Sequence, residues 1–264
     1  MERIPVTEYT LFYEVVDGNL MRYMEPVLVA AELRPGNGRP LVLLHSLAGG
    51  AATLEPLAAA LAGLRPVVSV DLRGFGASHR PTLAYTADTW ADDLAALLPA
   101  LGIAPGAADV YGHGFGACAA VAALERGLVG AAVVSGVGFA AGEPSGLDDL
   151  ADAGDLGESL VEALAALTGA PVIGADITSQ VVSRVARGWL EYGGPADAAA
   201  LAGRLLVVAS ANDAFTPAGA PAGAVAVGAA AGADVLTLHA GHDLPTSQPA
   251  ELAAAICSFL DQKR

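Results

Sequence analysis

Residues capable of acid–base and hydroxyl chemistry follow short apolar runs at several places in this 264-residue chain. His45 and Ser46 follow one such run, Asp213 follows another, and His242 comes shortly before the final amphipathic stretch. Imidazole, carboxylate and hydroxyl groups transfer protons or attack carbonyl groups when a fold brings them together. The chemistry open to them therefore depends on the elements that position them.

One stretch is typical of a strand, a sharp turn and the first turn of a helix: Asp109-Val110-Tyr111-Gly112-His113-Gly114-Phe115-Gly116-Ala117. Gly112, Gly116 and Ala117 are small enough to let the strand and the helix approach each other closely. The N–H groups and the dipole at the helix start favour an anion at the turn. The central residue, Gly114, has no side chain that could attack a substrate.

The apolar pattern predicts an α/β fold with a mostly parallel sheet. Buried strands are expected at 41–44, 67–70, 131–134, 205–209 and 235–238. Helices are expected at about 52–63, 115–126 and 249–261, and an Ala/Gly-rich helix is expected before 235–238. Another helix, which Thr86 or Asp88 can cap, carries apolar residues at helical spacing: Trp90, Leu94, Leu97, Leu98 and Leu101. Strands that alternate with helices at this spacing indicate βαβ units. Before them, 9–16 and 22–33 are expected to pair as two strands around the turn Asp17-Gly18-Asn19.

Residues 141–204 break this rhythm and predict a helical cap, which leaves 1–140 and 205–264 as the core. The first part of the cap is acidic, and its spacing favours a solvated helix face over a metal site. The second part is amphipathic around Val181, Val182, Val185 and Trp189. A site beneath an apolar cap indicates a small, largely apolar substrate with a carbonyl group, such as an ester, a lactone or a polyketide-like molecule.

Charge and cysteine content narrow the function classes. A net charge of -15 argues against nucleic acid and against an anionic membrane surface as partners. Two cysteines form no disulfide framework, and the first residues lack the features of a signal peptide, so a cytoplasmic protein is expected. The sequence contains no convincing zinc-ligand spacing, phosphate-binding loop or dinucleotide-binding turn, so neither a metal nor a cofactor is expected. The expected partner is a small-molecule substrate.

From about residue 9 to the end, the chain resembles the α/β-hydrolase superfamily. Five features in the family order carry the resemblance: the H-G-x-like turn His45-Ser46-Leu47, the D-x-R-G-x-G-x-S segment from Asp71 to Ser78, the G-x-S-x-G-like elbow around Gly114, Asp213 after a strand, and His242 before the last helix. The resemblance implies that His242 is the general acid–base and that Asp213 orients its ring. It also implies an oxyanion hole formed by the backbone N–H groups of Leu47 and Phe115.

Gly114 departs from the family, because it occupies the position of the nucleophilic serine and cannot form an acyl-enzyme. Three hypotheses follow. The protein is an enzyme that works without a covalent step, through hydrolytic or lyase-type acid–base chemistry. Alternatively, it is a serine esterase or lactonase inactivated by a Ser→Gly change, or a ligand-binding protein without catalysis.

Two further residues are candidates for substrate binding. Ser46 stands where many relatives carry glycine, and related hydroxynitrile lyases carry threonine there, which suggests lyase-type chemistry. A hydrogen bond from Ser46 to nearby backbone is the alternative, and a replacement nucleophile is a third possibility that its place beside the elbow tip disfavours. His113 precedes the nucleophile position, where a purely structural histidine is the alternative to substrate contact.

Overall fold

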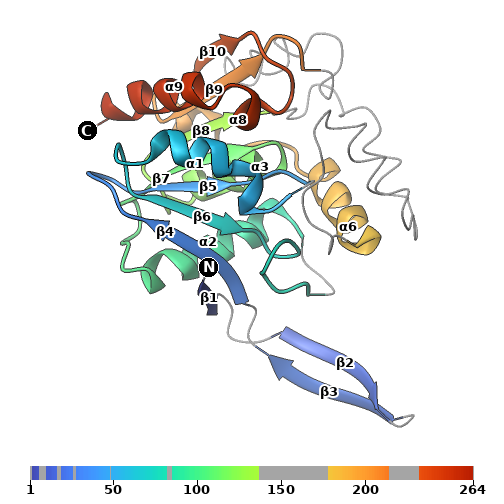
Figure 1. Ribbon diagram of the computed structural model, residues 1–264. Helices are drawn as coiled ribbons and strands as arrows, with labels where there is room; N and C mark the ends of the chain where they lie inside the picture. The colour runs from blue at the N-terminus through green and yellow to red at the C-terminus, as the bar shows by residue number, and fades with distance from the viewer. Residues whose placement is uncertain are drawn as a thin grey trace.

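The computed structural model describes residues 2–5, 10–16, 19–25, 28–47, 49–81, 85–136, 178–213 and 232–263. Its main sheet has eight strands in the order β1-β4-β6-β5-β7-β8-β9-β10 (Figure 1). Their bounds are β1 Glu2–Pro5, β4 Leu28–Arg34, β5 Leu41–Leu44, β6 Val67–Asp71, β7 Asp109–His113, β8 Ala132–Ser135, β9 Leu205–Ser210 and β10 Asp234–Leu238. In sheet order, the strands from β6 to β10 run parallel, whereas β4 runs antiparallel to both of its neighbours, β6 and β1. The predicted α/β fold with a mostly parallel sheet is therefore confirmed.

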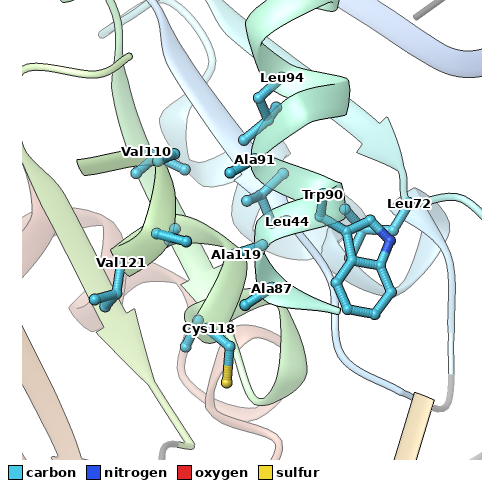
Figure 2. Packing of buried hydrophobic residues seen from close by; sticks show 14 of the residues in the cluster. Leu44, Leu72, Ala87, Trp90, Ala91, Leu94, Val110, Cys118, Ala119 and Val121 are labelled. Atoms are coloured by element: carbon cyan, nitrogen blue, oxygen red, sulfur yellow. The ribbon is translucent and has the colours of Figure 1, made fainter. Parts of the chain in front are cut away.

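Helices cover both faces of the sheet. One face carries α2 (Ala87–Ala100) and α3 (Phe115–Glu125), and the other carries α1 (Glu55–Leu61), α8 (Leu244–Ser247) and α9 (Pro249–Asp261). Helix α6 (Ser179–Leu190) lies beyond the carboxyl ends of the strands in Figure 1 and adds apolar side chains to the core on the α2 side. Successive residues of a strand point to opposite faces, so Val42 and Leu44 join the first core while Leu41 and Leu43 join the second. Figure 2 shows the first core, where Ala91 of α2 and Ala119 of α3 lie among larger apolar side chains. These small residues let the two helices pack closely beside β7.

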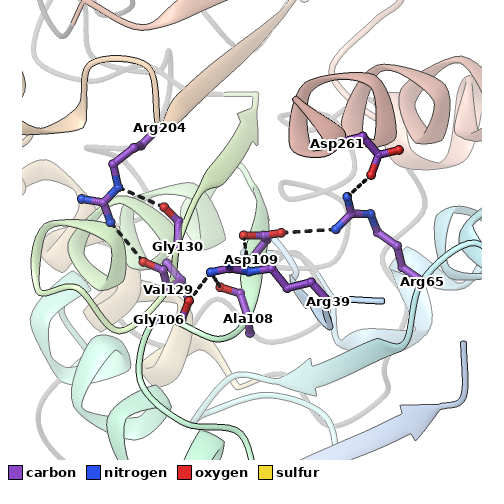
Figure 3. Close-up of polar contacts among 9 residues, drawn as sticks. All are labelled: Arg39, Arg65, Gly106, Ala108, Asp109, Val129, Gly130, Arg204 and Asp261. Carbon is purple, nitrogen blue, oxygen red and sulfur yellow. Dashed lines mark hydrogen bonds and ion pairs between the residues drawn. The ribbon is translucent and has the colours of Figure 1, made fainter. Parts of the chain in front are cut away.

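The amino-terminal end of the sheet is held by ion pairs (Figure 3). Arg65, whose side chain is buried, lies 3.2 Å from Asp109 at the start of β7 and 2.7 Å from Asp261 at the end of α9. These pairs tie β7 to the final helix at the end of the strand away from Gly114. The loops that hold the candidate catalytic residues lie at the opposite end of the sheet.

The hairpin prediction is confirmed in part and corrected in part. Strands β2 (Thr10–Val16) and β3 (Asn19–Glu25) pair antiparallel around the predicted turn and form a separate two-stranded sheet that extends from the main body in Figure 1. The single strand expected at 22–33 is wrong, because β3 ends at Glu25 and β4 begins at Leu28. Pro26 lies between them, and proline has no N–H to donate to a ladder. Strand β4 pairs with β1 and β6 instead.

Only part of the predicted cap lies in the described residues, since 137–177 fall outside them; the helix expected before β10 also lies in an undescribed segment, 214–231. The described part contains α6 and the short helix η2 (Ala198–Leu201). Thr178 caps α6 by accepting a hydrogen bond from the N–H of Val181 at 3.4 Å, and Val185 and Trp189 are buried on the same helix. The division into core and cap stays a prediction. In the described part of the chain, no helix is long and apolar enough to cross a membrane.

Candidate active site

The elbow is a tight turn between β7 and α3. Gly114 has φ 53° and ψ -116° and comes directly before the first residue of α3. A Cβ on Gly112 would lie 2.4 Å from the carbonyl oxygen of Gly116, and a Cβ on Gly116 would lie 2.5 Å from the carbonyl oxygen of Leu44. No side chain fits at such distances, so both glycines are required for the close approach of helix and strand. At Gly114 the positive φ itself favours glycine.

Asp213 and His242 meet at the carboxyl end of the sheet. Asp213 follows β9, and His242 lies between β10 and α8. The two loops are joined by a 2.9 Å hydrogen bond from the N–H of Asn212 to the carbonyl of Ala240. Within this frame, Nδ1 of His242 lies 3.1 and 3.2 Å from the two carboxylate oxygens of Asp213, and both side chains are buried. The carboxylate accepts the Nδ1 hydrogen and so fixes the orientation of the imidazole ring.

The other ring nitrogen of His242 lies on the side of the elbow. A Cβ placed on Gly114 would be 3.8 Å from Nε2 of His242. The structure therefore brings together Gly114, Asp213 and His242, which are far apart in the sequence. With Nδ1 carrying a hydrogen toward Asp213, Nε2 is the basic atom of the ring.

The two backbone segments proposed for the oxyanion hole border the same space. Phe115 begins α3 immediately after Gly114, and the first N–H groups of a helix lack partners within the helix. The Phe115 ring is fixed from both sides, 3.9 Å from the Trp90 ring and 5.7 Å from the Trp189 ring between centroids. Leu47, which is buried, follows the Ser46 side chain that touches the Gly114 position. Both N–H groups thus belong to buried residues beside the elbow.

Ser46 lies against the elbow itself. A Cβ on Gly114 would lie 2.2 Å from Oγ of Ser46 and 2.9 Å from its Cβ. The side chain of Ser46 therefore fills space that a nucleophile side chain at position 114 would need. This contact was not predicted from the sequence, where Ser46 is expected only beside the elbow tip.

His45 holds Ser46 in place. The N–H of Leu72 donates a 3.0 Å hydrogen bond to Nε2 of His45, so the ring hydrogen is on Nδ1. Nδ1 then donates to the carbonyl of Ser46 at 2.7 Å. Burial lowers the pKa of His45, which keeps this ring neutral and its two hydrogen bonds intact. Leu72 belongs to the D-x-R-G-x-G-x-S segment, so this segment supports the Ser46 turn directly.

Asp71, at the start of that segment, ties the segment to the chain that follows the Ser46 turn. Its carboxylate accepts hydrogen bonds from the N–H of Ala51 at 2.7 Å and from the N–H of Ala77 at 2.9 Å. Arg73 forms a buried ion pair with Asp93 of α2. The segment therefore orders the loops beside the site.

His113 is buried behind His242. Its Nδ1 lies 3.0 Å from Oγ of Ser135, whose hydroxyl also lies 2.6 Å from the hydroxyl of Tyr111. The His113 and His242 rings are 4.9 Å apart between centroids. Burial, and after it the neighbouring His242, lower the pKa of His113 to about 3, so His113 remains neutral beside its partner. These contacts are the ones expected if His113 has a purely structural role. Contact between His113 and the substrate stays a prediction.

Gly136 was missed by sequence reasoning and lies where the two rings meet. It has φ +62°, and a Cβ there would lie 2.8 Å from Cε1 of His113 and 2.9 Å from Cε1 of His242. The available signal was its position, because Ser135-Gly136 ends the strand next to β7, at the sheet edge where the elbow lies. A glycine at this position allows both imidazoles to sit side by side.

Comparisons with known proteins agree with the fold. Among solved structures, a mutant of a meta-cleavage product hydrolase from Pseudomonas fluorescens IP01 superposes with a TM-score of 0.73 at 19% identity, over 96% of this chain and 98% of that chain. A serine-to-glycine mutant of an N-acyl homoserine lactonase, in complex with N-hexanoyl homoserine lactone, gives a TM-score of 0.70 at 21% identity, over 96% and 98%. At such identities the likeness shows the fold.

Sequence relatives cover less of the chain. A 2-(acetamidomethylene)succinate hydrolase from Mesorhizobium japonicum is 35% identical over 91 residues, which are 34% of this chain and 32% of that protein. The match thus spans about a third of the length of that relative. The sequence pattern of the Alpha/beta hydrolase family, by contrast, matches residues 41–255. With that match over most of its length, this chain belongs to the Alpha/beta hydrolase family.

Proposed function

We propose that this protein is a cofactor-independent hydrolase that cleaves small, largely apolar carbonyl compounds, such as esters or lactones, without a covalent intermediate. The observation that carries the proposal is the buried His242–Asp213 pair, aimed at an elbow whose central residue is Gly114. The pair is the proton-transfer apparatus of a hydrolase, and it remains although the elbow nucleophile is absent. Water then takes the place of the nucleophile.

The proposed reaction has two proton transfers. Nε2 of His242 takes a proton from water while the water oxygen bonds to the carbonyl carbon of the substrate. The N–H groups of Leu47 and Phe115 hold the oxyanion that forms. When the intermediate collapses, the bond to the leaving group breaks, and the leaving oxygen receives the proton from His242. Asp213 stabilises the imidazolium between the two steps.

The packing around residue 114 favours this hypothesis over an inactivated serine hydrolase. Rotation of the Ser46 side chain would move its Oγ away from a new side chain at 114, but its Cβ would stay 2.9 Å from the new Cβ. Contacts this short require backbone movement, and His45 and its hydrogen bonds resist that movement. The surroundings thus fit a glycine. A recent Ser→Gly change would be expected to leave space instead.

The substrate class is inferred from the similar proteins and from helix α6. The hydrolases among the similar proteins act on a meta-cleavage product, an N-acyl homoserine lactone and 2-(acetamidomethylene)succinate, by their names. All are small molecules, and Trp189 of the amphipathic helix α6 packs beside Phe115 at 5.7 Å between ring centroids. We therefore place a short acyl ester or lactone first among candidates.

The test is hydrolysis of a panel of short-chain aryl esters, N-hexanoyl homoserine lactone and 2-(acetamidomethylene)succinate. His242→Ala should lower kcat by at least about 10³-fold on any substrate that the unaltered protein turns over. His239→Ala is the matched control, because His239 is an exposed histidine three positions away. Equal turnover by both variants would refute the proposed function. Tight binding of a panel member without any chemical change would favour the ligand-binding alternative.

A further inference from the structure

The hydroxyl missing from the elbow is supplied by a neighbouring loop. Oγ of Ser46 lies 2.2 Å from the point where the Cβ of a nucleophile at 114 would lie, closer than the Cβ of Ser46 at 2.9 Å. The hydroxyl end of Ser46 thus points into the nucleophile position. Residues 46 and 114 share one side-chain volume, and in this chain Ser46 occupies it.

This hydroxyl is held rigidly and can be reached. The carbonyl of Ser46 accepts the Nδ1 hydrogen of His45 at 2.7 Å, and His45 is itself fixed by the N–H of Leu72. The edge of the His45 ring packs on Phe75 at 5.2 Å between centroids. His45 and Leu47 are buried, whereas Ser46 between them is partly exposed. Such an arrangement presents one polar group to a substrate while its backbone stays fixed.

The limit on the distance to the base allows a bridging water. The distances of 2.2 and 3.8 Å from the Gly114 Cβ point place Ser46 Oγ within about 6 Å of His242 Nε2. One water with two hydrogen bonds of about 2.8 Å joins two atoms that lie about 4–5 Å apart, which is within this limit. A water between them would donate one hydrogen to Nε2 and the other to Oγ. Its lone pair would then face the substrate carbonyl.

We propose that Ser46 is a catalytic residue that holds the attacking water against His242, in the volume that a nucleophilic serine would fill. This inference rests on the proposed hydrolysis and adds a residue to it. As the reaction proceeds, one O–H bond of the water breaks and its proton moves to Nε2, while the water oxygen bonds to the carbonyl carbon. The second hydrogen stays on that oxygen and remains hydrogen-bonded to Oγ, so Ser46 forms no bond with the substrate.

The first experiment compares Ser46→Ala and Ser46→Thr on the best substrate of the panel. Loss of the hydroxyl should lower kcat by about 10- to 100-fold with little change in KM, and Thr, which keeps the hydroxyl, should retain most of the rate. Ser247→Ala, which alters an exposed serine of α8, is the control. If kcat of Ser46→Ala equals that of this control, the inference is wrong. His242→Ala in the same assay keeps the two proposals apart, because its loss of rate would still support the proposed hydrolysis.

The second experiment needs no substrate and tests the shared volume. A fluorophosphonate probe should leave the unaltered protein unlabelled, because Ser46 does not act as a nucleophile. Gly114→Ser alone should be labelled slowly, since its side chain collides with Ser46, and Ser46→Gly/Gly114→Ser should be labelled at residue 114 at least about tenfold faster. Equal labelling of the single and double variants would overturn the shared volume. Labelling of Ser46 in the unaltered protein would overturn its role in holding water.

Discussion

Gly136→Ala tests whether close packing of His113 and His242 is needed to position the catalytic base. Gly136 has φ +62°, and the added Cβ would lie 2.8 Å from His113 and 2.9 Å from His242. The left-handed backbone costs an L-residue about 1–2 kcal/mol. Forcing a methyl group into a packed site adds about 1–3 kcal/mol. We therefore expect the free energy of unfolding to fall by about 2–5 kcal/mol.

Gly127→Ala separates the two contributions to this loss. Gly127 has φ +68°, but a Cβ there would meet no atom within 4 Å. It should lose only the backbone part, about 1–2 kcal/mol. Urea denaturation of both variants followed by circular dichroism gives the difference, which is the cost of displacing the two rings.

The same pair of variants should differ in catalysis. His113 is hydrogen-bonded to Ser135, and His242 is hydrogen-bonded to Asp213. A methyl group added at position 136 must therefore displace at least one of the two rings from its partner. A shift of about 1 Å in a catalytic group can cost about 10²-fold in rate. Gly136→Ala should therefore lose kcat, whereas Gly127→Ala should keep it. Equal losses of stability, or unchanged kcat in Gly136→Ala, would refute this account of ring packing.

Three further predictions concern single residues. Asp213→Asn should lower kcat by about 10³- to 10⁴-fold with little change in KM, measured on the best ester, because the neutral amide cannot stabilise the imidazolium and its NH₂ can donate to Nδ1 and favour the wrong tautomer; an unchanged kcat would contradict the role of Asp213. The pKa of His113 is about 3 in the folded protein and about 6.5 in the unfolded chain. Between these two pH values the unfolded chain binds a proton that the folded protein does not bind. The free energy of unfolding should therefore fall as the pH decreases, by up to about 1.4 kcal/mol per pH unit. Urea denaturation at pH 7, 6 and 5 should show this slope reduced in His113→Gln, and identical slopes would count against a buried neutral ring. Asp93→Ala should lower the free energy of unfolding by about 3–5 kcal/mol, because it leaves the buried Arg73 guanidinium without its carboxylate. Asp92→Ala breaks an exposed ion pair with Arg126 and should lower the free energy of unfolding by less than about 1 kcal/mol in the same denaturation assay.

The sequence predicted the elements that have strong local signals. The apolar runs of β5, β6, β7, β8, β9 and β10 are short and bounded by turn residues, and their order with the helices determines the parallel sheet. Thr86 was expected as a possible cap, and it caps α2 by accepting a hydrogen bond from the N–H of Thr89. The division of 22–33 into two strands was missed because both halves are β-prone, and only Pro26 marks the break.

Side-chain packing across the site could not be predicted in the same way. The sequence indicated that Ser46 and Gly114 lie near each other, but whether the hydroxyl points into the nucleophile position depends on how His45 and Leu72 hold the turn. Gly136 looks like an ordinary glycine after a strand until two histidines from other elements meet there. Such contacts depend on distances between loops that are remote in the sequence.

The most direct test of the non-covalent route is the intact mass of the protein, quenched in acid during steady turnover of an aryl ester. A water-dependent reaction at His242 predicts only the unmodified mass while the ester is consumed, with turnover lost in His242→Ala. A species heavier by the mass of the acyl group, formed and lost at the rate of turnover, would contradict it.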